Sequence, residues 1–239
     1  MFAGPNGSGK STIKSVIRPE LIGTYVNADE LEQQIREQRA VDLEPFGVRT
    51  TQGEISAFFE SSTLLQRDGL VSEAQAIRLR GESLDFGDLE ANSYFASVIA
   101  DFLRRKLVAA STSLTFETVM SSRDKVDFLR AAQAQGFRTY LYYVATGDPL
   151  VNVSRVQNRV KLGGHAVPEK KIVSRYSRSL DLLAEAIRAS NRAYIFDNSG
   201  AKPIWLAEVT DGRRLEVKTR RVPAWFKQFV WDRMEPPAG

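Results

Sequence analysis

The strongest constraint on this chain lies near its beginning, in the segment Gly4-Pro5-Asn6-Gly7-Ser8-Gly9-Lys10-Ser11-Thr12. Its spacing, G-x-x-x-x-G-K-[ST], is that of a phosphate-binding loop, which joins a buried strand to a helix. Glycines let backbone amides surround phosphate oxygens, Lys10 can reach the β- and γ-phosphates, and the Ser11 hydroxyl can bind Mg²⁺. The segment predicts a site for ATP and Mg²⁺. The alternative is a glycine-rich turn that binds nothing.

Only three residues, Met1-Phe2-Ala3, precede this loop. A buried parallel strand usually has about five residues. We therefore expect either an unusually short first strand or a missing natural N-terminus, and we favour the second. The expected loss is core packing under the loop rather than phosphate ligands.

Composition limits the chemistry that the 239 residues can support. The chain has no cysteine and one histidine, which excludes disulfides, thiolate metal sites and histidine-rich metal sites. No apolar run approaches 18 residues and no segment resembles a signal peptide, so we expect a cytoplasmic enzyme without a membrane partner. The net charge of +4 suits an anionic small substrate. Nucleic acid is not expected, because no basic stripe is interleaved with aromatic residues.

The pattern along the chain alternates strands with helices, which indicates an α/β fold with a mostly parallel sheet. We expect a single three-layer P-loop domain over 1–239, with a mainly helical insertion at about 40–110. Expected strands are 24–27, 113–116, 139–145 and 193–197, followed by a hairpin of 204–210 and 215–219 around Asp211-Gly212. Expected helices are 11–17, 29–38, 123–135, 149–161, 169–190 and a closing helix 223–234.

Two carboxylates follow predicted strands, at the sheet edge where ligands bind in open α/β folds. Asp29, in Asn27-Ala28-Asp29-Glu30, is a candidate base for a substrate hydroxyl, and its alternative role is a helix cap. Glu117 ends the next apolar strand and is a candidate for binding a hydroxyl or organising Mg²⁺. Polar residues after it offer hydroxyls and a cation to a substrate, or cap the next helix: Thr118, Ser121, Ser122 and Arg123.

Four arginines flank the Gly163-Gly164 loop: Arg155, Arg159, Arg175 and Arg178. Phosphoryl transfer needs cations over the developing charge, and two helices joined by a flexible loop form a lid, here around 159–175. The alternative is a solvated helix face. His165 is expected to be a surface residue. Asn198 and Ser199 are candidates for base or ribose contacts, or belong to a turn.

Taken together, these residues resemble the zeta-toxin family of P-loop kinases, especially its chromosomal stand-alone branch. The specific matches are Asn27-Ala28-Asp29-Glu30, Phe116-Glu117-Thr118 and the pattern Arg-Val…Gly-Gly-His-x-Val-Pro…Arg-Tyr…Arg-Ser-Leu over 155–180. The family phosphorylates a hydroxyl of UDP-N-acetylglucosamine with ATP. The stretch 40–110 is longer than the family pattern needs, and the lid sequence differs from that of the best-studied toxins.

The resemblance implies a role for each matching residue. Lys10 and Ser11 would hold ATP and Mg²⁺, and Asp29 would be the base. Arg159 and Arg175 would stabilise the transferred group. The sugar nucleotide would contact Asn27, Glu117, Thr118, Ser121 and Arg123. An antitoxin partner is a further expectation, which no residue pattern indicates. The alternatives are a kinase of another metabolite or nucleoside, a non-kinase P-loop ATPase, and a module that binds nucleotide without turnover.

Overall fold

A computed structural model describes residues 1–163 and 166–234 of the chain; Gly164 and His165 of the predicted lid lie outside these ranges. The residues group into two compact units. Unit 1 comprises Met1–Arg18 and Glu117–Gly239, and unit 2 comprises Pro19–Phe116. The second unit includes the segment that the sequence predicts as an insertion, but it begins earlier, at Pro19.

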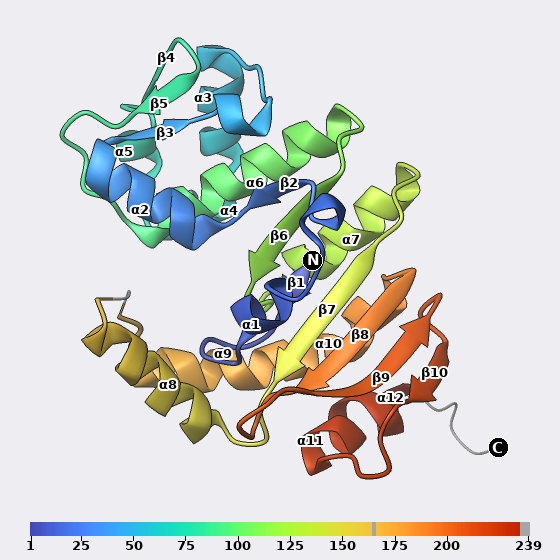
Figure 1. The fold of residues 1–239 in the computed structure, drawn as a ribbon. Helices are drawn as coiled ribbons and strands as arrows, with labels where there is room; N and C mark the ends of the chain where they lie inside the picture. Colours follow the sequence, from blue (N-terminus) through green and yellow to red (C-terminus); the bar gives the residue numbers. More distant parts are fainter. Residues whose placement is uncertain (164–165, 235–239) are drawn as a thin grey trace. The chain divides into compact units, whose positions relative to one another are not determined.

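A seven-stranded sheet has the order β10-β9-β8-β7-β1-β6-β2 (Figure 1). Strand β6 (Leu114–Thr118) contributes to both units, because its last residues pair with β1 and its first residues pair with β2. The pairs among β2, β6, β1, β7 and β8 are parallel, and β9 and β10 are antiparallel. The other strands of unit 1 are β1 (Phe2–Ala3), β7 (Tyr140–Ala145), β8 (Arg192–Asp197), β9 (Ile204–Thr210) and β10 (Arg214–Val217).

Helices cover both faces of the sheet in unit 1. On one face, Ile13 of α1 packs with Phe2 and Val144. On the other, the Tyr143 hydroxyl lies 3.0 Å from Ser179 Oγ of α9. Adjacent strand residues point to opposite faces, so this is a three-layer arrangement. The helices are α1 (Lys10–Lys14), α7 (Asp124–Ala134), α8 (Pro149–Lys161), α9 (Glu169–Asp181), α10 (Leu183–Arg188), α11 (Ala224–Phe226), a π-helical turn (Lys227–Trp231) and α12 (Asp232–Met234).

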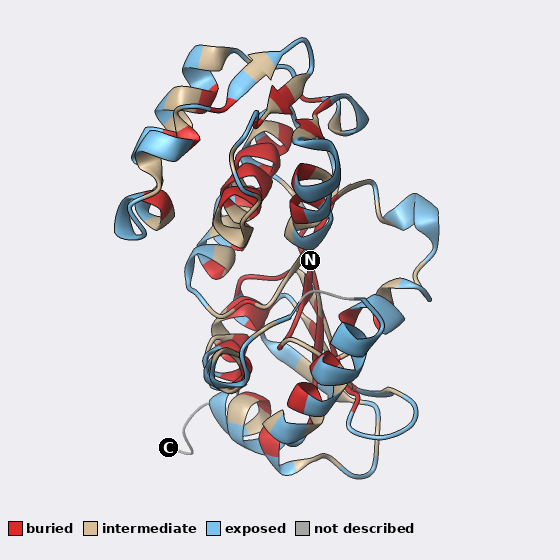
Figure 2. Ribbon diagram, turned by 90° about the vertical axis from the view of Figure 1, so that its left-hand side faces the viewer, coloured by how far each residue is buried: buried red, intermediate tan, exposed pale blue. Residues whose placement is uncertain are grey.

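Unit 2 is mainly helical, with its buried residues on the inner faces of its helices (Figure 2). Helix α3 begins with a reciprocal cap, in which Thr51 and Glu54 exchange hydrogen bonds between side chain and backbone. Its elements are β2 (Thr24–Val26), α2 (Ala28–Gln38), β3 (Ala40–Asp42), α3 (Gln52–Ser61), α4 (Thr63–Arg67), α5 (Val71–Ala74), β4 (Arg78–Arg80), β5 (Ser83–Asp85) and α6 (Ser93–Ala109), with short 3₁₀ turns at Pro19–Leu21 and Glu44–Phe46.

The predicted fold class and the C-terminal hairpin are confirmed. The segment predicted as a mainly helical insertion contains α3, α4, α5 and α6, together with a small sheet, β3-β5-β4, which the sequence did not predict because three-residue strands are too short to show an alternating pattern. One local prediction was wrong. The predicted helix 169–190 is two helices separated by Leu182. At this break the carbonyl of Asp181 accepts a hydrogen bond from Arg233, 3.0 Å away.

Candidate functional site

The phosphate loop connects the two-residue strand β1 to helix α1 in unit 1. Gly9 has a left-handed φ of 96° immediately before the helix begins at Lys10. A Cβ atom on Gly9 would lie 2.0 Å from the side-chain nitrogen of Asn198, so only glycine fits there. The Thr12 amide in the first turn of this helix donates to the carbonyl of Gly9 (3.1 Å). In general, first-turn amides that lack such partners can bind an anion.

The Lys10 side chain lies inside this loop. The residue is 8 % exposed, and its ammonium group donates to the carbonyls of Gly4 (2.9 Å) and Pro5 (3.2 Å). Glu117 Oε1 is 3.9 Å from the same nitrogen. The cation is therefore held at the loop, next to the carboxylate that the sequence predicts as a substrate or magnesium contact.

Two polar atoms of the loop are buried without a partner. Within the described part of the chain, Asn6 Oδ1 and Ser8 Oγ make no hydrogen bond. Buried polar atoms usually have partners, and an exception calls for an explanation such as a bound ligand or water. The Ser8 hydroxyl can donate to a phosphate oxygen.

The end of β6 brings further predicted residues to the loop. Its Thr118 carbonyl accepts from the amide of Gly4 (3.3 Å), and its hydroxyl accepts from the amide of Met120 (3.0 Å). Ser121 follows and is partly exposed. Arg123 instead forms an ion pair with Glu185, at 2.8 Å. This pairing favours a structural role for the Arg123 guanidinium.

Asn27 and Asp29 belong to unit 2. The Asn27 side chain caps α2 by accepting from the amide of Asp29, 3.0 Å away. The Asp29 side chain is therefore not the cap, contrary to the alternative role considered for it. Asp29 lies exposed in the first turn of the helix.

The four arginines have different surroundings. Arg155 donates to the carbonyls of Asn198 (2.8 Å) and Gly200 (3.3 Å), and Arg178 donates to a carbonyl of its own helix. Arg159 is exposed on α8. It lies seven residues after Asn152 and thus on the same helix face. Arg175 is half-buried on α9.

Helices α8 and α9 pack against each other through Val153, Val156 and Ile172. Arg175 lies three residues after Ile172 and four before Ser179, whose hydroxyl donates to the carbonyl of Val119 just beyond β6 (2.7 Å). The α9 face that carries Arg175 is therefore the one directed toward the end of β6. The roles assigned to Arg159 and Arg175 at the phosphate loop remain predictions.

Sequence reasoning missed Asn152 and did not anticipate the partner of Asn198. The Asn198 side chain, a candidate for base contacts, donates to the carbonyl of Ser8 (2.8 Å), and Asn152 donates to the carbonyl of Asn6 (2.6 Å). Asn152 lies in an ordinary helical sequence with no motif around it. Its role is visible only when the helix is placed against the loop.

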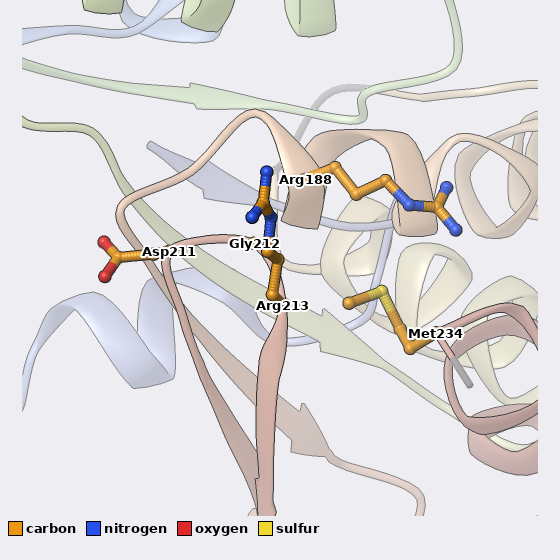
Figure 3. Close-up of a pocket in the computed structure, with 5 residues that line it drawn as sticks. All are labelled: Arg188, Asp211, Gly212, Arg213 and Met234. Carbon is orange, nitrogen blue, oxygen red and sulfur yellow. The ribbon is translucent and has the colours of Figure 1, made fainter. Parts of the chain in front are cut away.

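Other features of the described residues do not add a second site. A cavity of about 480 Å³ is lined by Arg188, Asp211, Gly212, Arg213 and Met234, none of them a predicted site residue (Figure 3). Over 1–163 and 166–234, no three histidine, aspartate or glutamate side chains gather to hold a metal. In the same ranges no helix has the length and apolar composition needed to cross a bilayer.

Comparisons with known proteins give matches among solved structures alone. No protein-family model matches the sequence, and no curated protein does. The crystal structure of AvrRxo1-ORF1:-ORF2 with ATP matches with a TM-score of 0.55 and 15 % identity, over 100 % of this chain and 65 % of the other. The same complex with sulphate ions gives 0.54 and 14 %, over 95 % and 62 %. This chain therefore shares the fold of the AvrRxo1-ORF1:-ORF2 chains that it matches.

A weaker likeness, with a TM-score of 0.48 and 17 % identity, is to a structure from the PezAT chromosomal toxin-antitoxin system of Streptococcus pneumoniae. It covers 84 % of this chain and 70 % of the other. The fold assignment rests on the first two structures. The chain spans less than two thirds of the length of the AvrRxo1-ORF1:-ORF2 chains it matches.

Proposed function

We propose that this protein is an ATP-dependent kinase that phosphorylates a hydroxyl of a nucleotide sugar such as UDP-N-acetylglucosamine. The observation that carries the proposal is the preformed phosphate loop with Lys10 buried at its centre. Its support is the fold, which is shared with a structure solved with ATP.

The loop residues fit a triphosphate. The Ser8 hydroxyl is unpartnered among described atoms, and Lys10 can exchange its carbonyl partners for phosphate oxygens. Ser11 is exposed at the start of α1, where its hydroxyl can bind a magnesium ion held mainly by the phosphates and water. Magnesium would neutralise charge on the β- and γ-phosphates.

In the proposed reaction, Asp29 accepts the proton of the acceptor hydroxyl as that oxygen attacks the γ-phosphorus. The bond from the γ-phosphorus to the β,γ-bridging oxygen breaks, and ADP leaves. Lys10, Arg159 and Arg175 stabilise the negative charge on the transferred group and the leaving oxygen. The exposed position of Asp29, with Asn27 already serving as the cap, leaves the carboxylate available for this role.

For the acceptor, the proposed contacts are Asn27, Glu117, Thr118 and Ser121, with Arg123 joining only if it leaves Glu185. A site whose polar groups need hydrogen-bond partners binds a substrate with hydroxyl groups in preference to one that lacks them. We also propose a protein partner, which the family resemblance would make an antitoxin, because the matched AvrRxo1 structures were solved as two-component complexes.

The test is transfer of ³²P from ATP, with Mg²⁺, to UDP-N-acetylglucosamine and to a panel of other nucleotide sugars and nucleosides. Asp29→Asn is expected to lower kcat by about 10²–10⁴-fold while ATP still binds. The matched control is Glu30→Gln, a neighbouring exposed carboxylate on the same helix, which should retain transfer.

The outcomes separate the alternatives. Transfer to a different acceptor alone would refute the nucleotide-sugar assignment and keep the kinase. ATP hydrolysis without transfer, unchanged in Asp29→Asn, would instead identify a P-loop ATPase.

A further inference from the structure

Two buried carboxamides contact the phosphate loop from elsewhere in unit 1. Asn152, in the first turns of α8, donates to the carbonyl of Asn6 at 2.6 Å and is fully buried. Asn198, just after β8, donates to the carbonyl of Ser8 at 2.8 Å and is 8 % exposed. The two acceptors are alternate residues of the loop.

Each asparagine is held in place by further hydrogen bonds. Asn152 Oδ1 accepts from the hydroxyl of Thr146, which leaves its NH₂ group to face the loop. The backbone amide of Asn198 donates to the carbonyl of Ala145 (2.8 Å), and its carbonyl accepts from Arg155 (2.8 Å). Arg155 therefore supports the loop indirectly, through Asn198.

The asparagines also set the space available to the loop. A Cβ atom on Gly7 would lie 2.6 Å from the backbone oxygen of Asn152, and one on Gly9 would lie 2.0 Å from Asn198 Nδ2. Such distances leave no room for a side chain. The two glycines are needed because the loop is pressed against these residues.

We infer that Asn152 and Asn198 are positioning residues that orient the loop amides for phosphate. In a trans peptide the C=O and the following N–H point in opposite directions. Fixing the carbonyls of Asn6 and Ser8 outward therefore turns the amides of Gly7 and Gly9 inward. The loop is prepared before the nucleotide arrives, which avoids the cost of ordering it on binding. This inference rests on the proposed function only in taking the ligand to be a polyphosphate.

The test uses Asn152→Asp and Asn198→Asp in the full chain. Each change keeps the side-chain size but places an oxygen opposite a carbonyl oxygen. Loss of the bond, with repulsion in its place, is expected to weaken binding of ATP and of tripolyphosphate by about 10- to 100-fold. Asn158→Asp, the same change at an exposed site on the same helix, should leave binding unchanged.

Two readouts separate positioning from general damage. The KM for ATP should rise while the KM for the acceptor stays constant. Lowering the pH should restore ATP binding to Asn152→Asp relative to the wild type, because a protonated carboxyl can again donate to the Asn6 carbonyl. If Asn152→Asp does not fold, Asn198→Ala serves as a second variant. It removes the hydrogen bond to the Ser8 carbonyl without adding charge and should also weaken ATP binding.

Unchanged ATP affinity in folded variants would overturn the inference, as would failure of all three variants to fold. Wild-type protein that binds ATP and tripolyphosphate but transfers nothing would refute the kinase and leave the positioning role standing. Wild-type protein that binds neither would refute both.

Discussion

Replacing Gly4 with alanine tests how tightly the phosphate loop is built onto the sheet. Gly4 has φ of +143°, and a Cβ atom there would lie 2.0 Å from the backbone oxygen of Val144. Val144 belongs to β7, which is paired with β1 on one side and β8 on the other, so its carbonyl cannot move aside. Backbone strain costs about 1–3 kcal/mol and overpacking about 1–3 kcal/mol, which predicts a loss of about 2–6 kcal/mol.

The assay is urea unfolding of Gly4→Ala beside the wild type. The matched control is Gly200→Ala, because a Cβ atom on Gly200 has no heavy atom within 4 Å and the residue has no positive φ. The control should change the free energy of unfolding by less than about 1 kcal/mol. If Gly4→Ala lowers the free energy of unfolding by less than about 1 kcal/mol, then β7 can shift to make room for the Cβ atom, and the reasoning is refuted.

Three further outcomes are expected from unfolding measurements. Trp225→Phe removes a buried hydrogen bond from the indole to the Asp197 carboxylate (3.0 Å) and should lower the free energy of unfolding by about 1.5–3 kcal/mol. An unchanged free energy of unfolding would show that this bond does not stabilise the fold. Burial raises the pKa of Tyr176 to about 12. The unfolded chain then loses this proton first, so stability should fall from about pH 10 to 12, and Tyr176→Phe should flatten that fall. Thr51→Ala removes the helix cap that pairs with Glu54 and should lower the free energy of unfolding by about 1 kcal/mol. An unchanged midpoint of urea unfolding would contradict the capping role.

Much of the fold could be predicted from local sequence. The phosphate loop, the helix Pro149–Lys161 and the hairpin at Asp211-Gly212 depend on residues close together in the chain, and the structure places them as expected. The short strands β3, β4 and β5 of unit 2 could not be predicted, because one or two apolar residues in a three-residue strand give too little pattern to separate it from a loop.

The sequence by itself determined that the chain has a phosphate loop and which cations and carboxylates accompany it. Tertiary structure decided what each of them contacts: Glu117 lies near Lys10, Arg123 pairs with Glu185, and Arg155 supports a backbone turn. It also revealed Asn152 and Asn198, whose loop partners lie 146 and 190 positions away in the chain. The physical reason is that a hydrogen bond depends on atoms within about 3 Å, and only folding brings such distant residues together.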